Sequence, residues 1–224
     1  MYTSSDQSAD NLAPRLPQLG EKAPAFESTT TQGPLRLSDL KGQWVILFSH
    51  PADFTPVCST ELMAFARLQG EFTRRKCRLV GLSVDSVYSH IAWVRDLERI
   101  GGFPVDFPII ADVDMHIARA YGMIHAGAGE AATVRSLFVI DPEGLLRAML
   151  HYPPNVGRNV PEVLRLLEAL QTADRENVAT PADWQPGEPV LVSTPRTQEA
   201  AQRRLEEGYE CEAWYLCHRP PDKS

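Results

Sequence analysis

Short runs of apolar residues alternate with helically spaced apolar residues over most of the chain. Two of these runs, 44–49 and 78–84, predict buried strands because they are rich in β-branched and large apolar residues. After each run, apolar residues recur three and four positions apart, which predicts helices over 58–74 and 87–100. The same pattern predicts a strand over 107–110, a helix over 113–121, strands over 136–140 and 145–150, and a helix over 159–173.

This alternation of strands and helices indicates an α/β fold with a central sheet flanked by helices. Asp141-Pro142-Glu143-Gly144 is a turn sequence between the last two strands, so we expect these strands to form a hairpin. A hairpin added to strands that are joined by helices makes the sheet mixed.

The composition changes near residue 177. Six prolines fall between 181 and 221, around one short charged helix near 196–207. A segment of this kind cannot build a core of its own. Trp184, Trp214 and Tyr215 carry too much apolar area to leave in water, so we expect the tail to pack on the main domain or on a second subunit.

Charge and composition restrict the partners. The chain has 224 residues, 43% of them apolar, and its formal net charge is 22 − 29 = −7. An acidic balance argues against nucleic acid or an anionic membrane as the main partner. The first fifteen residues are polar and unlike a signal peptide, and we expect them to be disordered. Four cysteines without a signal favour the cytoplasm.

One cysteine lies where the first predicted strand meets its helix. Pro51 ends the strand because proline cannot donate to a sheet ladder. Thr55 is a good N-cap and Pro56 suits the first helical position. Cys58 then occupies the third helical position, among free amide groups and at the positive end of the helix dipole.

Ionisation of this thiol requires more than the helix. Only about 3% of an ordinary free thiol is ionised at pH 7. The dipole contributes about 1 kcal/mol of the roughly 3 kcal/mol needed to make the thiolate the main form, so a nearby cation is required. The alternative interpretation of Cys58 is a buried structural cysteine that packs as a small apolar residue.

The pattern Pro-x-x-x-Thr-x-x-Cys over 51–58, directly after an apolar strand, resembles the active-site signature of the peroxiredoxins, which are thiol-dependent peroxidases. The longer stretch 49–62 is similar to the one-Cys (peroxiredoxin-six) subfamily. The resemblance implies a thioredoxin-like fold over 16–173. The stretch 180–188 resembles the subfamily's C-terminal arm, which packs across a dimer, and this implies an arm over 174–224.

The resemblance also assigns the chemistry. It implies that Cys58 attacks a peroxide oxygen and becomes a sulfenic acid. Arg135 and Arg158 lie in stretches that match the subfamily, 133–141 and 152–159, and would bind the thiolate and the peroxide. Such a site needs hydrogen-bond donors as well as a fixed cation.

Four neighbours of the cysteine are expected to complete the pocket. Thr55 would turn its hydroxyl toward the site, and Pro51 would shape the pocket and exclude water. His50 and Glu61 match subfamily positions, and Glu61 would orient an arginine. The alternatives are a packed histidine at the strand end and an exposed glutamate in the first helical turn.

The tail departs from the one-Cys pattern because Cys211 and Cys217 are spaced C-x₅-C. The stretch 209–217 resembles the tail of archaeal-type thioredoxin peroxidases. By that resemblance, Cys217 resolves the Cys58 of a partner subunit. Cys211 then exchanges with Cys217, and thioredoxin or a similar dithiol completes the reduction. The alternative is a pair of unrelated tail thiols. Cys77 is interpreted as structural.

These observations favour a cytoplasmic homo-oligomeric peroxidase that reduces hydrogen peroxide and organic hydroperoxides without a cofactor or metal. The resemblance implies dimers that assemble into a ring, a decamer. The alternatives are a one-Cys peroxidase recycled by an external thiol, a holdase-type chaperone formed by the ring, and a general thiol–disulfide oxidoreductase. Glu61 occupies the fourth position of a motif that starts at Cys58, so no Cys-x-x-Cys begins there, which argues against a general thiol–disulfide oxidoreductase.

Overall fold

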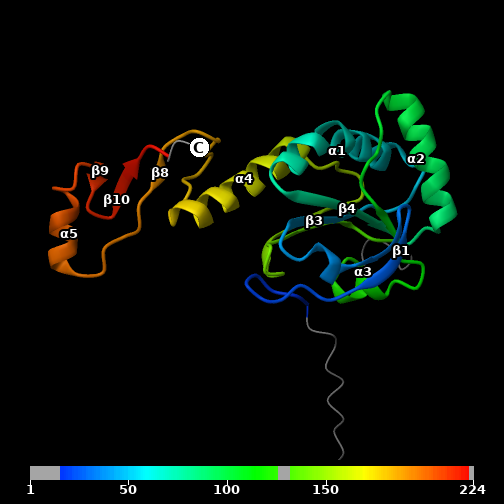
Figure 1. The fold of residues 1–224 in the computed structure, drawn as a ribbon, viewed down its shortest axis with the longest axis horizontal. Helices are drawn as coiled ribbons and strands as arrows, with labels where there is room; N and C mark the ends of the chain where they lie inside the picture. Colours follow the sequence, from blue (N-terminus) through cyan, green and yellow to red (C-terminus); the bar gives the residue numbers. More distant parts are fainter. Residues whose placement is uncertain (1–15, 126–131, 222–224) are drawn as a thin grey trace, which may run out of the picture. The chain divides into compact units, whose positions relative to one another are not determined.

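The computed structural model describes residues 16–125 and 132–221 (Figure 1). The predicted disorder of residues 1–15 therefore lies outside the described residues. The chain divides into two compact units. The first comprises the described residues up to Gln69 together with those of Lys76–Gly157, and the second comprises Gly70–Arg75 and the described residues from Arg158 onward. None of the helices in the described ranges is long and apolar enough to cross a bilayer.

A mixed sheet forms the centre of the first unit, as predicted, and it has seven strands. Its order is β2-β1-β5-β4-β3-β6-β7. The strands β3, β4 and β5 are parallel, and the other pairings are antiparallel. The strands are β1 (Glu27–Thr30), β2 (Gly33–Arg36), β3 (Trp44–Ser49), β4 (Cys77–Ser83), β5 (Ile109–Ala111), β6 (Arg135–Ile140) and β7 (Leu146–Tyr152).

The two faces of the sheet are covered by different helices. Val45 and Leu47 of β3 share a buried cluster with Ile117 of α3 (His116–Ala120). Phe48 points to the other face, where its ring stacks on Phe65 of α1 (Pro56–Arg74) at 4.1 Å. Figure 1 shows α1 and α3 on opposite faces of β3 and β4. Since both faces are covered, all six residues of β3 are buried.

Two helices connect the parallel strands and a third element precedes β3. The helix α2 (Val87–Gly101) begins at Ser86, whose hydroxyl accepts a hydrogen bond from the Ser89 amide, and it ends at Gly102 in the left-handed region. The 3-10 helix η1 (Leu37–Leu40) leads into β3. The predicted helix over 87–100 is confirmed, whereas β1, β2 and η1 have no counterpart in the predicted elements.

Several predicted boundaries differ from the observed ones by one to three residues, and two of the late starts have a visible cause. The helix predicted over 113–121 begins only at His116, because Met115 lies in the left-handed region and both carboxylate oxygens of Asp112 accept amides of the first turn. The strand predicted from residue 107 begins at Ile109, because Pro108 has no N–H to pair.

The second unit contains a long helix and a small sheet. The helix α4 (Val160–Glu176) begins at Asn159, whose side chain accepts the Glu162 amide. The sheet has the order β8-β10-β9, from Val190–Leu191, Leu216–Arg219 and Glu210–Ala213. The predicted helix near 196–207 is α5 (Gln198–Arg204). Buried Trp184 packs with Val190 and with Ala169 of α4, so the tail has a small core that includes this helix.

Candidate active site

Cys58 is the third residue of α1, as the sequence predicts. The carbonyl of Thr55 accepts a hydrogen bond from the Ser59 amide at 3.0 Å, so the helix begins at this threonine. The hydroxyl of Thr55 donates to the Ala52 carbonyl at 2.8 Å and fixes the turn before the helix. Cys58 is 0% exposed, and Pro51 is half-buried. A thiol in this position is removed from bulk water and lies in the first turn of a helix.

The guanidinium of Arg135 lies beside this thiol. Its Nη1 donates to the Sγ of Cys58 at 3.4 Å and to the Oε2 of Glu61 at 2.7 Å. Its Nε and Nη2 donate to the Pro154 carbonyl at 3.0 and 2.6 Å. The side chains of Arg135 and Glu61 are each 2% exposed, so their charges act where water screens little. The expected pairing of Glu61 with an arginine is therefore present.

The order of the strands explains why Arg135 lies beside Cys58 and Glu61. Arg135 is the first residue of β6, and β6 pairs with β3, the strand that leads into the Cys58 turn. Glu61 follows Cys58 by three positions, so both side chains lie on one face of α1. At the start of β6, Ser49 and Ser136 are joined through the Ser49 hydroxyl, which accepts the Ser136 amide at 3.1 Å.

Three further predicted residues, Arg158, Cys211 and Cys217, lie in the second unit. Arg158 is buried, with 6% exposed, directly before Asn159 and α4. Cys211 on β9 and Cys217 on β10 face each other across the hairpin and form a disulfide. Cys217 is 1% exposed, whereas Cys211 is half-buried. The disulfide near the C-terminus agrees with the predicted exchange between these two cysteines.

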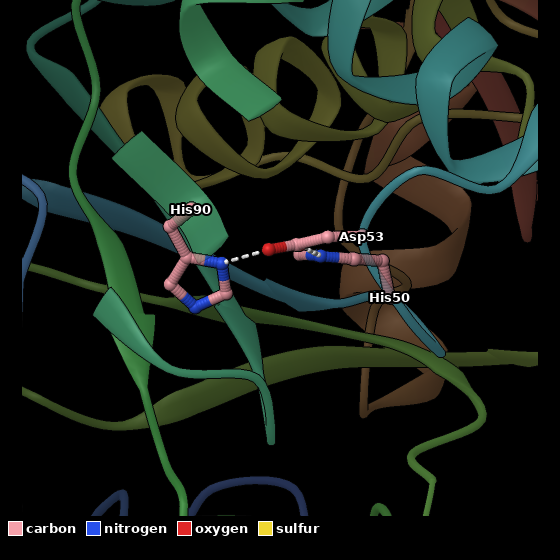
Figure 2. Close-up of side chains that lie close together, drawn as sticks. All are labelled: His50, Asp53 and His90. Carbon is pink, nitrogen blue, oxygen red and sulfur yellow. Dashed lines mark hydrogen bonds and ion pairs between the residues drawn. The ribbon is translucent and has the colours of Figure 1, made fainter. Parts of the chain in front are cut away.

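His50 belongs to a buried cluster that sequence reasoning missed. The two carboxylate oxygens of Asp53 contact two histidines, with Nε2 of His50 at 2.9 Å and Nδ1 of His90 at 2.8 Å (Figure 2). The histidine side chains are fully buried and that of Asp53 is 1% exposed. Burial alone would raise the pKa of Asp53, but the hydrogen bonds from the two histidines lower it well below its usual range.

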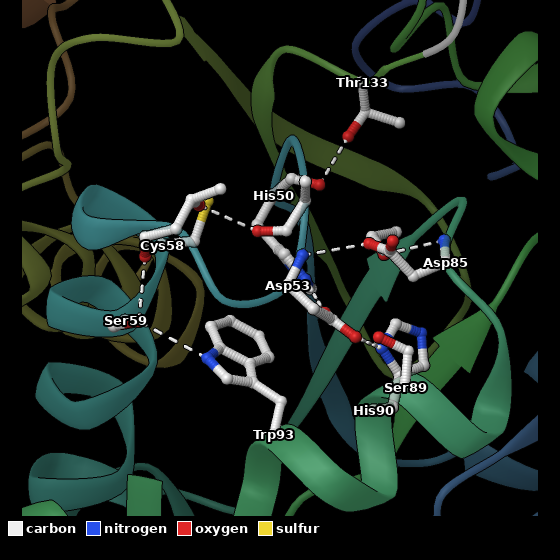
Figure 3. Close-up of polar contacts among 12 residues, drawn as sticks. His50, Asp53, Cys58, Ser59, Asp85, Ser89, His90, Trp93 and Thr133 are labelled. Atoms are coloured by element: carbon white, nitrogen blue, oxygen red, sulfur yellow. Dashed lines mark hydrogen bonds and ion pairs between the residues drawn. The ribbon is translucent and has the colours of Figure 1, made fainter. Parts of the chain in front are cut away.

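Further polar contacts surround this cluster (Figure 3). The indole N–H of Trp93 donates to the hydroxyl of Ser59, the residue after Cys58. Thr133 donates to the carbonyl of His50 at 2.8 Å. The carboxylate of Asp85 accepts the Asp53 amide at 3.0 Å. The one signal in the sequence was a histidine and an aspartate three positions apart in an apolar surrounding. Since Asp85 and His90 come from other segments, spacing alone could not connect them.

Two groups of side chains have the composition of a metal site. His50, Asp53 and His90 form one, and Asp112, Asp114 and His116 form the other, with their candidate ligand atoms within 4.8 Å of one another. In the first group the nitrogen and oxygen atoms are hydrogen-bonded to each other. In the second, Asp112 accepts two backbone amides of α3.

Cys77 lies apart from this chemistry. It is a free, buried cysteine at the start of β4, and burial raises the pKa of its thiol far above the usual range. A thiol that stays protonated is not a nucleophile, which supports the structural interpretation.

The site has a buried cysteine in the first turn of a helix, and an arginine contacts both its sulfur and a glutamate. On an α/β fold with a mixed sheet, this arrangement is that of a thiol-dependent oxidoreductase. The comparisons with known proteins specify the class. Residues 19–149 match the AhpC/TSA family model, and residues 169–208 match the model of the C-terminal domain of 1-Cys peroxiredoxin. The chain is 57% identical over 216 residues to a peroxiredoxin of Aquifex aeolicus, covering 91% of this chain and 97% of that protein.

Solved structures agree. A yeast mitochondrial 1-Cys peroxiredoxin matches with a TM-score of 0.82 at 41% identity, over 91% of this chain and 99% of that one. Peroxiredoxin 6 of Arenicola marina matches with a TM-score of 0.81 at 37% identity, over 92% and 99%. The chain therefore belongs to the peroxiredoxin family and is a thiol peroxidase with the thioredoxin-like fold.

Proposed function

We propose that Cys58 is the peroxidatic residue and that Arg135 is the cation that activates it. The observation that carries this is the single guanidinium nitrogen that lies 3.4 Å from the sulfur and 2.7 Å from Glu61. The thiolate attacks one peroxide oxygen, the O–O bond breaks, and the other oxygen leaves as an alkoxide or hydroxide that takes a proton. Cysteine is oxidised to sulfenic acid while the peroxide is reduced to water or an alcohol.

The other predicted residues have supporting roles in this proposal. Pro51 and Thr55 form the turn before the cysteine, and the Thr55 hydroxyl, which donates to the Ala52 carbonyl in the structure, turns its hydrogen toward the peroxide in this proposal. Glu61 orients Arg135. Arg158 is a second peroxide-binding cation in this proposal, and it lies, 6% exposed, directly before the start of α4. His50 contributes through the buried Asp53 cluster.

The tail cysteines recycle the enzyme in this proposal. Cys217 of one subunit attacks the sulfenic acid at Cys58 of another, releasing water and forming an intersubunit disulfide. Cys211 then attacks the sulfur of Cys217, which frees Cys58 and leaves the Cys211–Cys217 disulfide. That disulfide is present in the β9–β10 hairpin, which supports this order of steps. Thioredoxin or a similar dithiol reduces it.

An oligomer follows from the same proposal. Leu205, Trp214 and Tyr215 are exposed by 58%, 45% and 59%, which supports an arm that is covered by a second subunit. We propose dimers that assemble into a ring, a decamer, in the cytoplasm. The free cysteines among the described residues, Cys58 and Cys77, are consistent with a reducing compartment.

A non-reducing gel after peroxide treatment tests the recycling. We expect a disulfide-linked dimer that is absent from Cys58→Ser and from Cys217→Ser. Cys211→Ser should accumulate the dimer because the exchange step is blocked. Cys77→Ser is the matched control and should behave as the wild type.

The one-Cys alternative gives a different result. It is favoured by the matched yeast structure, whose description concerns thiol resolution through glutathione and thioredoxin systems in a 1-Cys enzyme. If Cys217→Ser keeps the wild-type rate of thioredoxin-supported cycling, an external thiol resolves Cys58 directly and the intersubunit step is wrong.

A further inference from the structure

Asp53 connects two histidines of different elements. His50 directly follows β3, and its Nε2 contacts Oδ1 of the carboxylate at 2.9 Å. His90 belongs to α2, and its Nδ1 contacts Oδ2 at 2.8 Å. The three side chains, shown in Figure 2, are at most 1% exposed, so both hydrogen bonds form where bulk water is excluded. Buried networks of this kind fix protonation states as well as positions.

Both ring nitrogens of His90 face oxygen atoms. Its Nε2 lies 3.1 Å from the Ile110 carbonyl, which can only accept, so Nε2 carries a hydrogen. Its Nδ1 faces Asp53, and that side chain is a carboxylate because its hydrogen bonds lower its pKa. A carboxylate also only accepts, so Nδ1 carries a second hydrogen. An imidazole with both nitrogens protonated is the imidazolium cation.

The hydrogen bonds of His50 indicate that its ring, unlike that of His90, is neutral. Its Nε2 donates to Asp53, and its buried Nδ1 has no hydrogen-bond partner among the described residues. A hydrogen on Nδ1 would be a buried donor without an acceptor, which is costly. Burial lowers the pKa of His50, and the positive His90 acts in the same direction. The neutral tautomer with a bare Nδ1 satisfies all of these contacts.

We propose that His90 is a buried imidazolium that neutralises Asp53, holds His50 in the neutral Nε2–H tautomer, and so acts as a positioning residue for the peroxidatic site. The charged and titratable groups that face His50 are Asp53 on its own segment, His90 on α2, and Asp85 after β4. Asp85 is itself satisfied by the Asp53 amide and by the Ser83 hydroxyl, at 3.0 and 2.7 Å.

The contacts of this cluster reach the reacting cysteine. Asp53 lies inside the turn that carries Pro51 and Thr55 into α1. The ring of His50 lies 5.0 Å from that of Trp93, whose N–H donates to Ser59, next to Cys58 (Figure 3). The effect on the reaction therefore rests on the proposed role of Cys58, whereas the charge state of His90 does not.

Nitrogen NMR of the wild-type protein tests the charge state directly. Histidine is labelled with ¹⁵N in the ring, and the signals are assigned by their loss in His90→Gln and in His50→Gln. We expect two protonated nitrogens in His90 and one in His50 from about pH 6 to about pH 8. A bare nitrogen in His90, or a metal ion bound in stoichiometric amount to the purified protein, would overturn the proposal.

Kinetics test the positioning role. In His90→Gln, Asp53 keeps only His50 as a possible cationic partner, so protonation of His50 becomes more favourable. The rate constant of the peroxide reaction should then gain an ionisation between about pH 5 and about pH 8 that the wild type lacks. Any rise in the pKa of His50 increases the ratio of its charged form to its neutral form at a given pH.

The double variant Asp53→Asn/His90→Gln is the matched control, because it removes the carboxylate together with the cation. We expect the added ionisation to disappear in it. An unchanged profile in His90→Gln would show that His90 is only structural, and an ionisation that persists in the double variant would exclude His50 as its source. If these variants fail to fold, the wild-type NMR signals still decide the charge state.

Discussion

At the scale of single residues, the proposed activation of Cys58 depends on one shared nitrogen. Nη1 of Arg135 contacts both the sulfur and Glu61, while the other two nitrogens of the guanidinium hold the Pro154 carbonyl. This arrangement requires the planar fork of arginine, since a lysine ammonium could not reach all three acceptors in one plane. In the proposal, the helix start and this cation act on the same sulfur.

Arg135→Met should lose both stability and activity, for separate reasons. It leaves the Glu61 carboxylate buried without this cation, which costs about 3–5 kcal/mol in the free energy of unfolding. Arg135→Met/Glu61→Leu removes both charges and should recover most of that loss. Neither variant should recover the rate of peroxide reduction, because the cation at the sulfur is absent from both.

Chemical denaturation and stopped-flow peroxide kinetics on the same samples measure the two effects. If the double variant regained the activity together with the stability, Arg135 would have a structural role only.

At the scale of elements, the sequence predicted the parts whose pattern is local. The buried run 44–49 is β3, and the helix start at Thr55 and Pro56 is present because both preferences are set within a few residues. The late start of α3 was not predictable in this way. It depends on the left-handed Met115 and on hydrogen bonds to Asp112, which lies outside the helix.

The residues of the candidate site also differ in whether a local stretch of sequence could predict them. Cys58, Thr55 and Pro51 were found from one continuous stretch, and Arg135 required the resemblance to a family. His90 and Asp85 could not be found, because their connection to Asp53 exists only after α2 and β4 are brought to the same end of the sheet. The small sheet of the tail was also missed, since its strands are two to four residues long and half-buried.

At the scale of the whole molecule, histidines that are fully or partly removed from water make stability depend on pH. Burial lowers the pKa of His50 and of His151 below the ordinary value of about 6.5. Such groups are neutral in the folded protein and charge more readily when it unfolds. Their contribution to stability is therefore complete above about pH 6.5 and is lost as the pH falls through that value toward the folded pKa.

We expect the free energy of unfolding to fall between about pH 6.5 and about pH 5.5, with a slope of at most about 1.4 kcal/mol per pH unit for each group, because above this range the proton held by the proposed His90 imidazolium acts in the opposite direction. His151 should contribute less than His50 because it is more exposed to solvent. Urea unfolding at fixed protein concentration measures this slope, and His50→Asn should reduce it. High salt is the control, because the net charge of −7 also changes with pH. An unchanged slope in His50→Asn would show that His50 does not titrate on unfolding.

The central claim is that the peroxide is reduced at Cys58. The most direct measurement is peroxide consumption with thioredoxin, thioredoxin reductase and NADPH, for the wild type, Cys58→Ser and the buried-thiol control Cys77→Ser. We predict that Cys58→Ser shows no consumption above the protein-free background, while Cys77→Ser keeps the wild-type rate. Turnover at the wild-type rate by Cys58→Ser would contradict the account.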